Sequence, residues 1–143
     1  MIQRNPTSRL HPVHVETFAV DFEYPVHFAS SVFAPENDLL ADTLDRLRER
    51  RRHRLAVFCD AGLAAARPGL CRAVREYVHA HADRLKLAGD VVTVPGGPPA
   101  KRGYETVRDV ITTLGNLHLD RQSHVVALGG GSMLDMSGFA TSL

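Results

Sequence analysis

The sequence predicts an α/β fold in which helices flank a largely parallel sheet. Short apolar runs typical of buried strands alternate with segments whose apolar residues recur at helical spacing. The last of these runs, residues 124–128, leads directly into three glycines and then into a helical pattern. With 44% hydrophobic and 23% charged residues, the 143-residue chain has the composition of one globular domain with one core.

Composition and charge argue against several functional classes. The formal net charge of +1 gives no whole-chain field for nucleic acid or a membrane surface. No apolar run approaches the roughly 18 residues that span a bilayer. Cys59 and Cys71 form no CxxC pair, so neither a disulfide framework nor a zinc cluster is indicated. We therefore expect a cytoplasmic protein whose partners include neither nucleic acid nor a membrane.

The first third of the chain is predicted to hold a lead-in, two strands and a helix. Residues 1–13 are expected to be a disordered lead-in, and residues 14–143 the α/β domain. Residues 15–20 and 24–33 are compatible with two strands, but both faces of each carry apolar residues. Asn37 is expected to cap a helix whose acids come early and whose arginines, within residues 46–52, come late. The apolar stripe of that helix is Leu39, Leu40, Leu44 and Leu47.

The rest of the chain is predicted to alternate strands and helices. Strands are expected at residues 54–60, 91–94 and 124–128, and a proline- and glycine-rich loop ends the second. Pro68 suits the first turn of a helix and Gly115 the end of the next one. The inward-facing residues expected of the three helices are Leu70, Val74, Tyr77 and Val78, then Val107, Val110, Ile111 and Leu114, then Met133, Met136, Phe139 and Ala140.

The unit formed by a strand, Gly129-Gly130-Gly131 and a helix is the strongest functional signal. Glycines let the main chain bend sharply and let a bulky anion approach it. The following helix presents free amides and a partial positive charge, which together favour a phosphate. The spacing is neither GxGxxG, because Leu134 stands at the third glycine position, nor a P-loop. A tight turn without a ligand is the alternative interpretation.

Three polar residues are placed to complete such a site. Asp60 ends a predicted strand and can bond ribose hydroxyls, whereas its plainer role is that of a turn residue. Lys101 can reach a phosphate or hydroxyl from the second loop, unless it is simply solvated. Asp135 lies one turn into the last helix, where an acid also complements the helix dipole.

These residues resemble the signature of 3-dehydroquinate synthases and related sugar phosphate cyclases. The family shows Leu-Asp-Arg before the strand, then three glycines, an aspartate and Gly-Phe-Ala, which match Leu119–Arg121, Gly129–Gly131, Asp135 and Gly138–Ala140. The loop PGGPPAKR is similar to the family's glycine-rich loop, with Lys101 at its lysine. The resemblance implies the N-terminal, Rossmann-like domain of the dehydroquinate synthase-like fold.

The resemblance also implies cofactors, a substrate and roles for individual residues. NAD would be a recycled oxidant, and a divalent metal, zinc or cobalt, would assist loss of phosphate and cyclisation of a seven-carbon sugar phosphate. Asp60 would hold the adenosine ribose, Lys101 a neighbouring ribose or phosphate, and Asp135 the nicotinamide side. Gly130 and Gly131 would hold the pyrophosphate, and Gly129 and Ser132 complete the predicted cofactor site.

Two residues depart from the family pattern, and the metal site is not found. Pro98 replaces a loop glutamate, and Leu134 replaces a glycine, which is more like a divergent branch of the family. The family's metal ligands lie in a helical C-terminal domain, whereas this chain ends at Leu143, inside a predicted helix. We therefore expect a truncated enzyme with no catalytic residue, no metal ligand and no turnover of its own. The eight histidines are interpreted as scattered surface residues, and the run RERRRHR as a solvated helix end.

Two other functions stay open. A metal-dependent alcohol or glycerol dehydrogenase shares the fold and the glycine loop, but commonly has Ala-Lys soon after the aspartate, where this chain has Met136-Ser137-Gly138. The other alternative is a non-catalytic nucleotide-binding fragment. Whether the protein forms a homodimer is left open.

Overall fold

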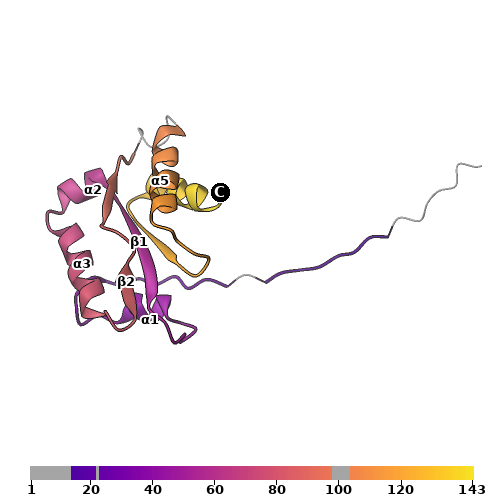
Figure 1. Cartoon of the computed structure of the whole chain (residues 1–143), viewed down its shortest axis with the longest axis horizontal. Coiled ribbons are helices and arrows are strands. Elements are labelled where there is room, and N and C mark those ends of the chain that lie inside the picture. Colours follow the sequence, from indigo (N-terminus) through magenta and orange to yellow (C-terminus); the bar gives the residue numbers. More distant parts are fainter. Residues whose placement is uncertain (1–13, 22, 98–103) are drawn as a thin grey trace, which may run out of the picture.

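The structure is a computed structural model and describes residues 14–21, 23–97 and 104–143. Its parallel sheet contains four strands, and helices lie on both faces (Figure 1). The predicted α/β class and the Rossmann-like arrangement are confirmed. The strands are β1 (His53–Asp60), β2 (Leu85–Leu87), β3 (Val92–Val94) and β4 (His124–Leu128). The helices are α1 (Leu39–Leu44), α2 (Ala61–Ala66), α3 (Leu70–Ala80), α5 (Tyr104–Asn116) and α6 (Gly131–Thr141).

Strand β1 lies at the centre of the sheet and pairs with each of the other three strands. Leu55 in its first half is paired with Leu87 of β2 on one side and with His124 of β4 on the other. Its second half is paired with β3 and again with β4. β2 and β3 therefore run end to end along one side of β1, and β4 lies along the other. The sequence did not predict β2, because three residues are too few to show a strand pattern.

The side chains of β1 alternate between two hydrophobic cores, one on each face of the sheet. Leu55, Val57 and Cys59 point to the face covered by α1 and α3. Ala56 and Phe58 point to the face covered by α5 and α6. A parallel strand buried on both faces reads as a continuous apolar run, which is why residues 54–60 were predicted correctly.

Helix α1 is shorter than predicted and ends at Leu44. Asn37 does support its start, because its Oδ1 accepts the amide hydrogen of Leu39 at 3.0 Å, although Asp38 is the capping residue by backbone position. Leu47 was expected on the apolar stripe but is 73% exposed. The chain has left the helix by Arg48, whose φ of 49° is left-handed. The arginines after the helix therefore do not complement its dipole.

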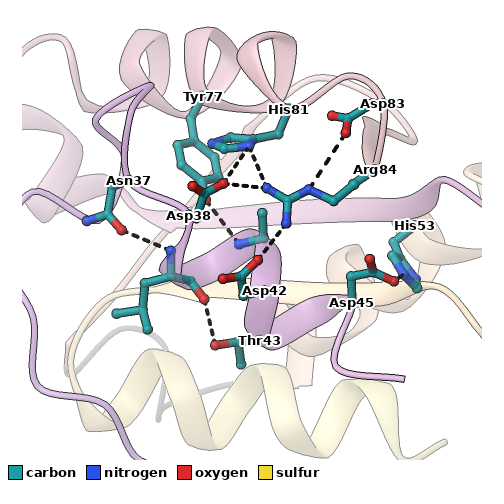
Figure 2. Close-up of polar contacts among 12 residues, drawn as sticks. Asn37, Asp38, Asp42, Thr43, Asp45, His53, Tyr77, His81, Asp83 and Arg84 are labelled. Atoms are coloured by element: carbon teal, nitrogen blue, oxygen red, sulfur yellow. Dashed lines mark hydrogen bonds and ion pairs between the residues drawn. The ribbon is translucent and has the colours of Figure 1, made fainter. Parts of the chain in front are cut away.

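A polar clasp, formed by Tyr77, His81 and Arg84 with Asp38 and Asp42, joins α1 to α3 (Figure 2). The buried Tyr77 hydroxyl accepts the amide hydrogen of Ala41 at 3.0 Å. Arg84 donates one hydrogen bond of 2.6 Å to each of the two aspartates. The clasp holds a six-residue helix that is too short to be stable alone.

The last two helices follow the predictions with two exceptions. α5 runs through Gly115 and ends at Asn116, so Gly115 is not its cap, and His118 adopts the left-handed turn instead, with φ 47°. In α6, Met133, Met136 and Ala140 are buried as predicted. Phe139 is 52% exposed, and Ser137 takes the inward position in its place.

Residues 14–21 form an exposed extended arm that leaves the body of the domain (Figure 1), and residues 23–29 are exposed without helix or strand. The strands expected at residues 15–20 and 24–33 were wrong, because no described strand pairs with these segments. These segments carry apolar residues on both faces, so neither face is clearly the one to be buried. The sequence pattern also does not show which other strand they would pair with. Within the described residues, no helix is long and apolar enough to span a membrane.

Candidate functional site

The predicted site lies at the C-terminal edge of the sheet, where three parallel strands end together. Asp60, the last residue of β1, is paired with Val94, the last residue of β3. Its neighbour Cys59 is paired with Leu128, the last residue of β4. The glycine-containing segments that follow β3 and β4 therefore begin on either side of Asp60, although both are distant from it in the sequence.

The carboxylate of Asp60 caps helix α2. Its Oδ1 accepts the amide hydrogens of Gly62 at 2.7 Å and Leu63 at 3.0 Å. Among the described residues, Oδ2 has no hydrogen-bond donor. The role of Asp60 as a turn residue is therefore present in the structure, whereas its Oδ2 lies against Gly96 and overlaps the position that a Cβ on Gly96 would take.

Two glycines are required by the position of Asp60. A Cβ on Gly96 would overlap the Asp60 carboxylate, and a Cβ on Gly129 would lie 3.0 Å from the Cβ of Asp60 and 2.7 Å from that of Met133. The chain passes so close to Asp60 at both loops that a side chain does not fit. Asp60 therefore sits in a narrow space between the two loops.

Gly130 and Gly131 differ from these packing glycines. A Cβ at either position would meet no atom of the described residues within 4 Å, and both residues are exposed. Neither has positive φ, so the predicted reason for the glycines, a sharp bend, is not what the backbone uses. Gly130 is extended, with φ −84° and ψ −177°. What the two glycines provide is open space over the main chain.

Helix α6 begins at this open space. Gly130 is its N-cap without a side-chain cap bond, and the carbonyl oxygen of Gly130 accepts the amide hydrogens of Met133 and Leu134. The amides of Gly131 and Ser132 have no acceptor among the described residues. Two free donors and the positive end of an eleven-residue helix thus face an accessible surface.

The structure gives less information on the other predicted site residues. Ser132 lies in the first turn of α6 and is half-buried, and Asp135 is exposed further along the same helix. Asp135 makes no ion pair with another described residue. Lys101 and Pro98 lie outside the described residues.

Two histidines were misjudged from the sequence. His53 and His81 are 2% and 7% exposed, so they are not surface residues. His53 Nε2 lies 3.0 Å from Asp45 Oδ1, and its Nδ1 has no partner among the described residues. No pattern of spacing distinguishes a histidine that enters the core at the start of a strand.

The described residues offer neither a metal site nor an activated thiol. No group of three or more His, Cys, Asp or Glu side chains among them is placed to hold a metal ion. Burial raises the pKa of the Cys59 thiol to about 11. Cys59 is therefore protonated at neutral pH and behaves as the small core residue that was predicted.

Comparison with known proteins confirms the predicted resemblance. Residues 91–143 match the family model described as 3-dehydroquinate synthase N-terminal. This range contains β3, α5, β4, the three glycines and α6.

Three curated relatives carry the name 3-dehydroquinate synthase. The protein of Methylacidiphilum infernorum is 33% identical over 75 residues, which are 50% of this chain and 21% of the relative. That of Sulfurovum sp. is 43% identical over 54 residues, 38% of this chain and 15% of the relative. The protein of Lactiplantibacillus plantarum is 39% identical over 64 residues, which are 43% of this chain and 18% of the relative. The matched part thus spans between 15% and 21% of each relative.

Proposed function

We propose, given that residues 91–143 are related to the N-terminal domain of 3-dehydroquinate synthases, that this chain binds NAD at the C-terminal edge of its sheet. It would supply the nucleotide-binding part of a sugar phosphate cyclase that acts on a seven-carbon sugar phosphate. The observation that carries the proposal is the open space over Gly130 and Gly131 at the start of α6, next to Asp60.

Two features of the site favour a dinucleotide, and two further residues are assigned by resemblance. The free amides of Gly131 and Ser132 and the helix dipole favour a pyrophosphate. The Oδ2 atom of Asp60 has no donor among the described residues, and we assign it a ribose hydroxyl on the side not covered by Gly96 while Oδ1 keeps its capping bonds. Asp135 is exposed on the same helix and is assigned to the nicotinamide side by resemblance. Lys101 is assigned a ribose or phosphate in the same way.

In the proposed function, NAD supplies the redox chemistry and this chain supplies the binding site. NAD, when bound, supplies an oxidant that is regenerated within the reaction. The residues of this chain bind and orient it, and none is assigned a catalytic role. The family's divalent metal is assigned no ligand among the described residues. The expectation that these 143 residues alone have no turnover stays a prediction.

Calorimetric titration with NAD⁺ tests the proposal. We expect weak, saturable binding that falls at least about tenfold, or about 1.4 kcal/mol, in Gly130→Val, because a side chain there occupies the path of the pyrophosphate. Val is compatible with the extended backbone and open space at this position, so the variant should fold. Gly115→Ala, which adds a methyl group in open space on α5, is the matched control.

A second variant tests Asp60 without removing its cap. Asp60→Asn keeps one oxygen for the amides of Gly62 and Leu63 but replaces the other with a donor. We expect it to weaken NAD⁺ binding and to leave stability nearly unchanged. Asp109→Asn, on the exposed side of α5, is its control. A chain that binds no NAD⁺ at all would defeat the proposal.

A further inference from the structure

A cavity of about 370 Å³, lined by both polar and apolar side chains, lies at the opposite, N-terminal edge of the sheet, away from the proposed nucleotide site. It is bordered by the end of α1, the loop that follows and the residues just before β4. Two sequence features that the proposed function does not use meet here. One is the arginine-rich run at residues 46–54, and the other is the Leu-Asp-Arg motif that ends at Arg121.

The lining of this cavity is positively charged. Arg46, Arg51 and Arg121 line it together with one acid, Glu49, which leaves a surplus of two positive charges. Glu49 is engaged by Arg51, whose Nη2 lies 2.7 Å from its Oε2. Neither Arg46 nor Arg121 forms an ion pair with a described residue. Two guanidinium groups at the cavity are therefore available to a ligand.

The acids next to Arg46 and Arg121 in the sequence are already hydrogen-bonded. Asp45 is 3.0 Å from His53 Nε2. Asp120 Oδ1 accepts hydrogen bonds from the Ser123 hydroxyl at 2.7 Å and the Gln122 amide at 3.0 Å. Since these carboxylates have partners, they compete little for Arg46 and Arg121.

His124 provides a titratable group at the cavity. Its ring lies edge-on to that of His53, with centroids 5.3 Å apart. Burial, and then the nearby His53 and Arg51, lower the pKa of His124, while Glu49 opposes them. His124 is therefore neutral at pH 7, and a bound anion would favour its protonated form.

We propose that this cavity binds a small phosphate-bearing anion through Arg46 and Arg121. The planar guanidinium group presents paired donors that match phosphate oxygens, which is why arginine is favoured in such sites. The proposal is independent of the nucleotide site, which lies at the other edge of the sheet.

An NMR titration of the full chain with sodium phosphate tests it, with sodium chloride used to hold ionic strength constant. The ring signals of His124, assigned with His124→Gln, report on the cavity. We expect a saturable shift and a rise in the His124 pKa. Arg46→Gln and Arg121→Gln should each weaken binding about fivefold or more, and Arg121→Lys should have an intermediate effect.

Two control variants make the outcome decisive. Arg108→Gln, on the exposed side of α5, and Gly130→Val, at the nucleotide site, should both bind phosphate at this cavity as the wild type does. A response that does not saturate, or that survives in the Arg46→Gln/Arg121→Gln double variant, would overturn the proposal. So would binding of an RNA oligonucleotide at this face without any response to phosphate or methyl phosphate.

Discussion

The carboxylate of Asp60 occupies the space that a side chain on Gly96 would need. This relationship links two loops and a helix, because the same carboxylate caps α2. A change at Gly96 therefore acts on α2 although it lies in another element.

Gly96→Ala is expected to displace Asp60 and to lower the free energy of unfolding by about 1–2 kcal/mol, since both overlap and loss of a cap are destabilising. It should also weaken NAD⁺ binding. Chemical denaturation and calorimetry measure the two effects. Gly115→Ala is the control, and a Gly96→Ala variant as stable as this control would contradict the expectation.

Tyr77→Phe removes the hydroxyl that accepts the amide hydrogen of Ala41. We expect a loss of about 1–3 kcal/mol, because a buried amide is left without an acceptor. Denaturant unfolding measures the loss. Tyr104→Phe removes a hydroxyl from a residue that is 61% exposed and should have almost no effect. Equal effects of the two changes would show that the Tyr77 hydroxyl contributes nothing to the clasp.

The pair formed by Asp45 and His53 predicts a dependence of stability on pH. The hydrogen bond from His53 lowers the pKa of Asp45 in the folded state. The ionised Asp45 carboxylate therefore stabilises the folded state above the ordinary aspartate pKa of about 4. This stabilisation is lost as the pH falls through the lower pKa that Asp45 has in the folded state. The difference in Tm between the wild type and Asp45→Asn should therefore shrink between about pH 6 and about pH 3. A difference that is constant over this range would argue against the pairing.

The raised pKa and the burial of Cys59 predict that it is unreactive in the folded protein. A thiol reagent at about pH 8 should modify Cys59 far more slowly than the partly exposed Cys71, because little thiolate is present and access is blocked. Mass spectrometry with Cys59→Ser and Cys71→Ser identifies each site. Equal rates in the folded chain would contradict the prediction, and equal rates are expected only after unfolding.

Most of the fold was predictable because its two longer strands contain apolar runs and most of its helices show one apolar stripe. β1 and β4 illustrate this, since each is a continuous apolar run. The end of α1 was not predictable, because the left-handed backbone of Arg48 leaves no mark in the apolar pattern. The exposed extended arm was missed because a strand needs a partner, and the sequence pattern does not name one.

The candidate site was predictable in its residues but not in its geometry. Asp60 and the three glycines were identified from their positions after apolar runs. The different roles of Gly129, which packs against Met133, and Gly130, which faces open space, depend on contacts between distant segments. For the same reason, the burial of His53 could not be foreseen.

The central position of β1 has a consequence for how the chain acquires its structure during synthesis. Leu55 is joined to Leu87 on one side, but its other neighbour, His124, is made much later by the ribosome. Until β4 has been made, the apolar strand β1 has one edge whose backbone groups are not paired with another strand. Nascent chains should therefore be more vulnerable to aggregation through this edge of β1 before β4 emerges than after it.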